Sequence, residues 1–173
     1  WDLSPKEAVT LQKELSLMLA FWPIRLPGIR LVAGVDVSVK GDRSKAAIVV
    51  MTFPALEKVE TVTSASRTCF PYVPGLLSFR EGPVILECVK ELKNEPDVFI
   101  FDGQGITHPR GIGIAAHIGL ILGKPSVGSA KSHLFGIYDA PGGKKGEYSL
   151  IKCPSGRSIG AVVRSRDGIK PIF

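Results

Sequence analysis

The sequence is poor in the features that define several large classes of protein. It has three cysteines in 173 residues, Cys69, Cys88 and Cys153, and none of them belongs to a Cys-x-x-Cys pair. This odd, scattered set excludes a disulfide scaffold and a zinc ribbon, and indicates reduced thiols. The longest nearly uncharged stretch, Gly111 to Gly123, is too short and too glycine-rich to cross a membrane. No secretory leader is visible, so we expect a cytoplasmic protein without membrane contact.

The length and composition are those of an ordinary globular protein. Hydrophobic residues make up 45% of the chain and charged residues 22%, which excludes a disordered chain. The 19 glycines and 13 prolines follow no period, so they indicate ordered loops rather than collagen or low-complexity sequence. We expect residues 1–173 to form a single domain that acts as a monomer.

The positive charge of the chain is confined to its last fifty residues. Residues 1–123 carry 13 basic and 13 acidic side chains, whereas residues 124–173 carry nine basic and three acidic ones. A basic region beside a neutral one favours a polyanionic partner such as nucleic acid, because each phosphate contact releases counterions. Many basic proteins bind no nucleic acid, so charge alone leaves the partner open.

The hydrophobic pattern predicts an α/β protein with a mixed sheet flanked by helices. Ser4-Pro5-Lys6-Glu7 is typical of a capped helix start, and apolar residues then recur at helical spacing as far as Trp22, before Pro23. Three strands with short connections predict an antiparallel meander: Leu31 to Val39, Lys45 to Phe53 and Glu57 to Phe70. The remaining predicted elements are a helix (Pro83 to Leu92), a buried parallel strand (Asp97 to Phe101), a helix (Gly111 to Leu122), a second buried strand (Ser126 to Ala130) and a hairpin (Glu147 to Ile151 with Ser158 to Arg164).

Two aspartates stand where an acidic side chain requires an explanation. Asp36 lies mid-strand between valines, where a buried carboxylate is costly unless a cation or several donors meet it. The alternative for Asp36 is a strand end or edge that faces water. Asp102 directly follows a predicted buried strand, at the end where open α/β sheets bind ligands, or else it caps a turn. If the two strands are neighbours, we expect two buried carboxylates roughly 5 Å apart, which repel unless a divalent cation bridges them.

Other residues can complete a metal site at this edge of the sheet. Oxygen ligands suit Mg²⁺, for which Mn²⁺ can substitute. Glu81, at the start of a predicted helix, can supply a third carboxylate; the alternative is a favourable charge at a helix N-terminus. Lys131 follows the next strand and can hold a phosphate, unless it is simply solvated.

Two loops contain residues suited to contact a nucleotide. Two prolines stiffen Pro71-Tyr72-Val73-Pro74, so that Tyr72 either wedges between stacked bases or packs into the core. The loop from Gly103 to Gly111 has glycines that let backbone N–H groups approach a base or phosphate, although it is no P-loop. His108 in this loop is either a ligand contact or a satisfied loop histidine, whereas we expect His117 to be structural.

Five segments together carry a resemblance to a known family. They are Val32 to Ser38, Pro71 to Glu81, Asp102 to Gly111, Ala116 to Leu120 and Val127 to Ser132. In this order they closely resemble endonuclease V, the repair nuclease for deaminated bases, from the first helix to Phe173. The run Pro-Tyr-Val-Pro-Gly-Leu-Leu is the most specific of these motifs.

The resemblance implies a ribonuclease H-like fold and a metal-dependent endonuclease. The family recognises hypoxanthine in DNA, and some members act on inosine in RNA. It cuts the second phosphodiester bond 3′ to the lesion and leaves 3′-hydroxyl and 5′-phosphate ends. By motif match, the metal ligands are Asp36 and Asp102, with Glu81 as the third acid and Lys131 beside the scissile phosphate. The residues implied in base recognition are Tyr72 as the wedge and Gly75, Leu77, Gly103 and His108 around the base pocket.

The sequence departs from the family pattern at two places. Gln104 stands where histidine is common, which bears on the contacts of its loop with metal or substrate. The chain also ends at Phe173, whereas family members continue through a loop with a catalytic histidine into a final helix. We therefore expect weak cleavage or none, with binding retained. The alternatives are an inosine-binding module that does not cut and another ribonuclease H-like nuclease, against which the Pro-Tyr-Val-Pro wedge argues.

Overall fold

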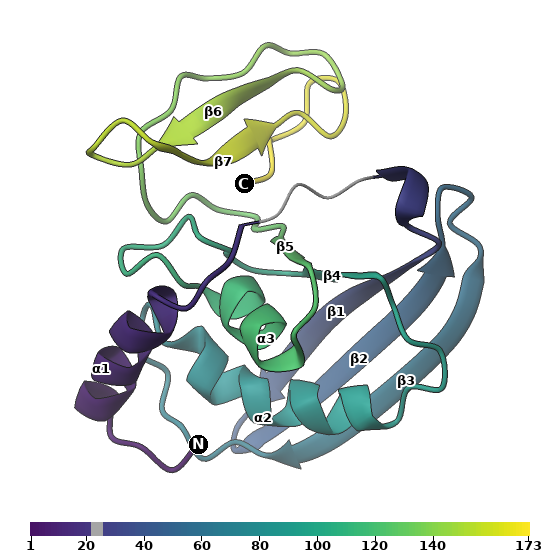
Figure 1. Cartoon of the computed structure of the whole chain (residues 1–173), viewed down its shortest axis with the longest axis vertical. Helices are drawn as coiled ribbons and strands as arrows, with labels where there is room; N and C mark the ends of the chain where they lie inside the picture. The colour runs from purple at the N-terminus through teal and green to yellow at the C-terminus, as the bar shows by residue number, and fades with distance from the viewer. Residues whose placement is uncertain (22–25) are drawn as a thin grey trace.

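The computed structural model describes residues 1–21 and 26–173. Figure 1 shows one mixed sheet of five strands, in the order β3-β2-β1-β4-β5, and a separate hairpin of β6 and β7. The strands are β1 (Leu31–Lys40), β2 (Arg43–Thr52), β3 (Lys58–Arg67), β4 (Val98–Phe101), β5 (Ser126–Gly128), β6 (Tyr148–Lys152) and β7 (Ser158–Val163). The helices are α1 (Pro5–Ser16), α2 (Leu77–Lys90) and α3 (Ile114–Leu122), with a short 3₁₀ turn η1 (Leu26–Gly28). The predicted α/β class is confirmed.

β1 lies at the centre of the sheet and has a partner on each side. It pairs antiparallel with β2 over its whole length, and β2 pairs antiparallel with β3, so the predicted meander is confirmed. On its other side β1 pairs in parallel with β4, but only over Val32 to Val35. The strand with Asp36 and the strand that precedes Asp102 are therefore neighbours, which meets the condition on which the predicted pair of carboxylates depends.

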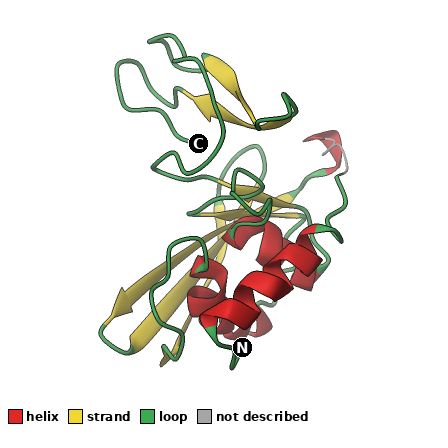
Figure 2. Cartoon of the chain, turned by 90° about the vertical axis from the view of Figure 1, so that its left-hand side faces the viewer, coloured by secondary structure: helices red, strands yellow, loops and turns green. Residues whose placement is uncertain are grey.

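The helices cover one face of the sheet, as Figure 2 shows from the side. Alternate apolar residues of β1 and β2, such as Val35 and Ile48, pack there against α2 and α3 in the main buried cluster. A second cluster joins α1 to the start of α2 through Ala8, Phe70, Leu76 and Phe79. The hairpin has its own small core around Ile151, Ile159 and Val162. None of the helices among the described residues combines the length and apolar character that a membrane crossing requires.

Helix α1 begins as predicted but ends earlier. The Ser4 hydroxyl and the Glu7 carboxylate form the predicted capping box, with the Ser4 N–H donating to Glu7 at 2.8 Å. The helix ends at Ser16, so the prediction that helical spacing extends toward Trp22 is wrong for residues 17–21. Those residues include apolar side chains that line a cavity beside α3, which explains their hydrophobicity without a helix. Trp22 and Pro23 lie outside the described residues.

Helix α2 begins at Leu77, well before the predicted start at Pro83, which lies inside the helix. Proline cannot donate to the carbonyl of the preceding turn and is commonest at helix starts, which is why the sequence favoured the later boundary. The buried side chains of Ser78 and Phe79 hold the first turn in place. Glu81 therefore lies inside α2 rather than at its N-terminus, and the interpretation of its charge as a helix-end effect is wrong.

The sheet face opposite α2 and α3 is open along β4 and β5. Val98, Phe99 and Phe101 are buried as predicted, but Ile100 is exposed. Val127 of β5 is 42% exposed, because β5 is the last strand of the sheet and its side chain points to this open face. The predicted strand is confirmed over Ser126–Gly128, and Ala130 is buried, but the prediction that the strand itself is buried is wrong.

Candidate metal centre and base-contacting loop

Three carboxylates approach one another at the end of β4. The backbone N–H of Asp102 donates to the Val35 carbonyl at 3.2 Å, which places Asp102 beside Asp36 of β1. Glu81 reaches the same place from α2. These three acids and their apolar neighbours line a cavity of about 10 Å³, which is close to the room that one water molecule needs.

Asp36 is exposed, contrary to the expectation that both aspartates are buried. β4 pairs with β1 only as far as Val35, so Asp36 is the first residue of β1 beyond the end of β4, where the sheet opens to water. The alternative of a strand edge that faces water is the one that the structure shows. Asp102 is partly buried, with 30% of its side chain exposed.

The acid cluster carries an excess of negative charge. Burial raises the pKa of Glu81 to about 7, the Asp36 carboxylate and more weakly Asp102 act in the same direction, and Arg80 opposes them. Neighbouring anions disfavour a further negative charge unless a cation compensates them. A divalent cation bound beside Glu81 would therefore stabilise the ionised form of its carboxylate.

Lys131 provides the positive charge that lies against these acids in the structure. Its ammonium group contacts the Oδ2 atom of Asp102, and this hydrogen bond and the carboxylate charge raise the pKa of Lys131. Within the described residues, no three His, Cys, Asp or Glu side chains are arranged closely enough to hold a metal ion. The oxygen donors nevertheless fit a hard divalent cation, with Asp36 and Asp102 as the candidate ligands and Glu81 beside them.

The loop before α2 presents Tyr72 to solvent. Tyr72 is 71% exposed, so the alternative that it packs into the core is excluded. The loop starts at Phe70, whose carbonyl accepts from Nη1 of Arg80 at 2.8 Å, and closes with a hydrogen bond from the Leu76 N–H to the Val73 carbonyl at 2.9 Å. The two prolines and these hydrogen bonds hold the aromatic ring outward.

Gly75 and His108 meet at the end of this loop. Gly75 has φ +80°, and a Cβ atom there would lie 2.6 Å from Nη2 of Arg110, so the position requires glycine. Nδ1 of His108 accepts from the Arg110 backbone N–H at 3.1 Å, so Nε2 carries the proton and donates to the Gly75 carbonyl at 3.0 Å. Burial, and secondarily the charge of Arg110, lower the pKa of His108 to about 4. His108 is thus a satisfied, neutral loop histidine.

Leu77 and Gly103 lie closer to the main core and the acids. Leu77, the first residue of α2, packs against the main buried cluster. A Cβ atom on Gly103 would lie 2.5 Å from Cγ2 of Ile114, which also lines the acid cavity. His117 is buried, with Nδ1 2.8 Å from the Ser78 hydroxyl, so its predicted structural role is confirmed.

A family model described as Endonuclease V matches residues 10–173. The chain belongs to the endonuclease V family. The endonuclease V of Kosmotoga olearia is 48% identical, over 100% of this chain and 76% of the relative. The endonuclease V of Dictyoglomus turgidum is 46% identical, over 97% of this chain and 73% of the relative. Membership of this family identifies the chain as an endonuclease.

Crystal structures of endonuclease V share the fold of this chain. That of Streptomyces avermitilis superposes with a TM-score of 0.92 at 35% identity, over 100% of this chain and 77% of the other. That of Ciona intestinalis, in complex with a 24mer DNA containing an inosine followed by a ribo-adenosine, has a TM-score of 0.86 at 27% identity, over 97% and 80%. The predicted ribonuclease H-like fold is thereby confirmed.

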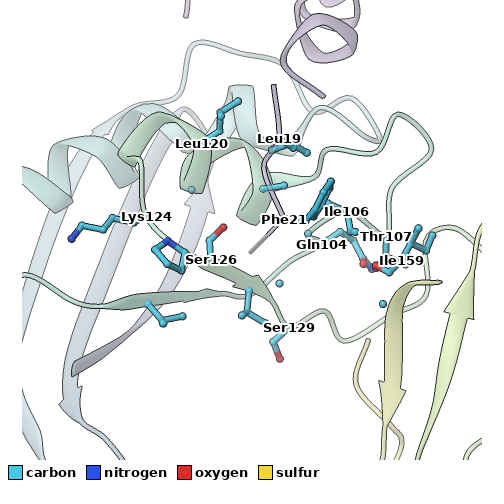
Figure 3. Close-up of a pocket in the computed structure, with 18 of the residues that line it drawn as sticks. Leu19, Phe21, Gln104, Ile106, Thr107, Leu120, Lys124, Ser126, Ser129 and Ile159 are labelled. Atoms are coloured by element: carbon cyan, nitrogen blue, oxygen red, sulfur yellow. The ribbon is translucent and has the colours of Figure 1, made fainter. Parts of the chain in front are cut away.

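A large cavity of this endonuclease V chain, of about 960 Å³, lies apart from the acids. Figure 3 shows it between Leu19 and Phe21, helix α3 and the loop after β4, with Ile159 of the hairpin at its edge. Among the described residues, none of those predicted for metal or base binding lines it. Gln104 does, and its Nε2 donates to the Ser132 carbonyl at 2.8 Å. Gln104 therefore connects the loop after Asp102 to the loop that contains Lys131.

Gln12 and Arg110 both contact the Gly75 carbonyl, and neither is among the site residues predicted from the sequence. Nε2 of Gln12 donates to it at 3.1 Å and Nη2 of Arg110 at 2.8 Å. The available signal was the place of Gln12 four residues after Ala8, on the apolar side of a predicted helix, where a polar residue needs partners. Arg110 gave no such signal, because an arginine in a loop is ordinarily solvated.

Proposed function

We propose that this chain recognises hypoxanthine in DNA, with inosine in RNA as a further substrate class, and cuts the backbone with the help of a divalent metal ion. The proposed cut is at the second phosphodiester bond 3′ to the lesion and leaves 3′-hydroxyl and 5′-phosphate ends. The observation that carries the proposal is the three-acid cavity at the end of β4, to which α2 contributes Glu81, while the loop that precedes α2 holds Tyr72 outward. The Ciona intestinalis relative, which binds inosine-containing DNA, supports the substrate class.

The residues at this cavity suit the hydrolysis of a phosphodiester bond. Asp36 and Asp102 would hold Mg²⁺, or Mn²⁺ in its place, and such an ion supplies Lewis-acid stabilisation of the phosphoryl oxygens and an activated water. Glu81 adds the third carboxylate. Lys131 contacts Asp102 in the structure, and its ammonium group would bind the scissile phosphate by charge attraction.

The Tyr72 loop and the glycines suit recognition of an extruded base. Extrusion costs a few kcal/mol, less at a weakened pair, and a side chain that fills the gap offsets part of this cost. Hypoxanthine differs from adenine by its O6 atom and its protonated N1, which backbone donors and acceptors can discriminate. We propose that Gly75, Leu77, Gly103 and His108 border the pocket and that Tyr72 is the wedge.

The proposal is tested by a nicking and binding assay on matched oligonucleotides. DNA duplexes with inosine or adenine at one position, and an RNA with inosine, are incubated with the purified chain in Mg²⁺, Mn²⁺ or Ca²⁺. We expect tighter binding to every inosine substrate and, in Mg²⁺ or Mn²⁺, a weak nick at the second bond 3′ to inosine. Inosine binding without any nick would favour the non-cutting module, and equal cutting of inosine and adenine duplexes would favour another ribonuclease H-like nuclease.

Tyr72→Ala is expected to weaken binding to an inosine duplex by about tenfold to a hundredfold, because base–aromatic stacking contributes about 1–3 kcal/mol. The melting temperature should stay unchanged, because the ring is exposed. Fluorescence anisotropy with a labelled duplex measures the affinity. Tyr148→Ala removes another exposed tyrosine, from β6, and is the matched control. Equal losses in the two variants would contradict the wedge assignment.

A further inference from the structure

The carbonyl oxygen of Gly75 is the meeting point of three side chains from outside its loop. Nε2 of Gln12, Nε2 of His108 and Nη2 of Arg110 all donate to it, at 3.1, 3.0 and 2.8 Å. A carbonyl ordinarily accepts two hydrogen bonds, one for each lone pair. The Gly75 carbonyl therefore accepts one hydrogen bond more than is ordinary, and all three come from outside its loop.

Gln12 connects this meeting point to two other parts of the fold. It lies in α1 with only 1% of its surface exposed, and its Nε2 also donates to the Ile112 carbonyl at 2.8 Å. Its Oε1 accepts a hydrogen bond from Nε of Arg110. One amide side chain thus ties the first helix, the Tyr72 loop and the segment before α3 together, with both ends of the amide in use.

The acceptor for Arg110 is a neutral amide rather than a carboxylate. Arg110 forms no salt bridge within the part of the chain that the structure describes. Gln12 therefore orients the guanidinium group without neutralising it, and a full positive charge remains beside a loop that presents an aromatic ring. Arginine in such a place suits a polyanionic ligand.

We propose that Gln12 is a positioning residue for the Tyr72 wedge, acting through Arg110 and the Gly75 carbonyl. The loop is then braced at both ends, by Arg80 on the Phe70 carbonyl and by the Gln12 group on the Gly75 carbonyl. A wedge can unstack a base pair only if the loop that carries it stays rigid under load. These hydrogen bonds to the Phe70 and Gly75 carbonyls, here called the brace, keep the loop rigid, so that binding of the duplex leads to extrusion of the base. The role of the loop in base extrusion rests on the proposed function, whereas the rigidity that these hydrogen bonds give the loop does not.

The brace is tested first without any nucleic acid, by hydrogen exchange of the backbone amides in residues 70–79. In this segment the Leu76 N–H bonds to Val73 and the Phe79 N–H bonds to Leu76. We expect Gln12→Met, which keeps the volume and removes the amide, to speed exchange here at least tenfold. Arg110→Lys keeps the positive charge but removes the planar guanidinium group, which donates through both Nε and Nη2. It should also speed amide exchange in residues 70–79.

Ser126→Ala is the matched control for this measurement. It removes a partly buried hydroxyl that donates to the Ala115 carbonyl at 2.8 Å, and neither residue lies within or next to residues 70–79 in the sequence. The control should leave exchange in residues 70–79 as in the unmodified chain. Unchanged exchange in both Gln12→Met and Arg110→Lys would overturn the brace, whatever the protein does with nucleic acid.

The second measurement asks whether the brace serves base extrusion. Binding in Ca²⁺ is compared for inosine within a duplex and inosine in a single strand, which needs no extrusion. We expect Gln12→Met to weaken duplex binding at least fivefold and single-strand binding less than twofold, in the pattern of Tyr72→Ala. Equal weakening on both substrates would show a merely structural role and overturn the positioning role. An unmodified chain without preference for inosine would instead refute the proposed function, while the exchange result still decides the brace.

Discussion

Asp102→Asn is expected to lower the rate of cutting of an inosine duplex about a thousandfold. The substitution removes one negative charge and one strong oxygen ligand from the three-acid cavity, and it also releases Lys131. Charge stabilisation by a bound metal ion contributes several kcal/mol to such a transition state, and each 1.4 kcal/mol changes the rate tenfold. Asp36→Ala should likewise abolish cutting while leaving nucleic-acid binding intact.

Single-turnover nicking and Mn²⁺ binding, followed by electron paramagnetic resonance, measure the two consequences of Asp102→Asn. Asp97→Asn is the matched control, because Asp97 stands before β4 as Asp102 stands after it. Asp97 accepts from the N–H groups of Arg30 and Leu31 at 2.8 and 2.9 Å, so this control should cost stability and leave cutting unchanged. Unaltered Mn²⁺ affinity in both Asp36→Ala and Asp102→Asn would refute the metal centre.

Lowering the pH from 7 to 4 is expected to destabilise the metal-free protein by several kcal/mol, through two buried histidines. Burial lowers the pKa of both His108 and His117 to about 4. In the unfolded chain the ordinary value is about 6.5, so between pH 6.5 and 4 the unfolded state binds more protons. The stability present above pH 6.5 is therefore lost as the pH falls, by about 3 kcal/mol for each histidine.

Two local features change the size of this acid effect in opposite directions. Protonation of His108 at Nδ1 breaks its bond from the Arg110 N–H, which adds to the loss of stability. Glu81 acts in the opposite direction, because burial raises its pKa to about 7 and the folded state gains stability as the pH falls from 7 to 4.5. Glu81→Gln should accordingly steepen the loss of stability in acid.

Urea unfolding at pH 7, 5.5 and 4.5 in the presence of a chelator measures the effect. The free energy of unfolding should fall steadily with pH, and His117→Gln should flatten this dependence. His133→Gln, at the exposed histidine, is the control and should follow the unmodified chain. A free energy of unfolding that stays constant from pH 7 to 4.5 in the unmodified chain and in Glu81→Gln would contradict the assignment.

Residues whose environment is local could be predicted well. The Ser4 capping box, the meander and the hairpin all depend on spacings within a few residues, and they are present as predicted. The pairing of β1 with β4 did not follow from the sequence, which left it as a condition, because the order of strands in a sheet depends on long-range contacts. Boundaries failed where tertiary contacts outweigh local preference: α2 starts before Pro83, and α1 ends at Ser16 although apolar residues continue.

For the candidate site, too, some features could be predicted from the sequence and others depend on the tertiary structure. The order of residue types along the chain was enough to point to Asp36, Asp102 and Tyr72, because an acid among valines and an aromatic ring between prolines conflict with ordinary strand and loop composition. Only packing decided that Asp36 faces water, that Glu81 lies within α2 and that Gln12 reaches the Gly75 carbonyl. Those outcomes depend on how far β4 extends and on contacts between residues more than sixty positions apart, and such distances leave no trace in local periodicity.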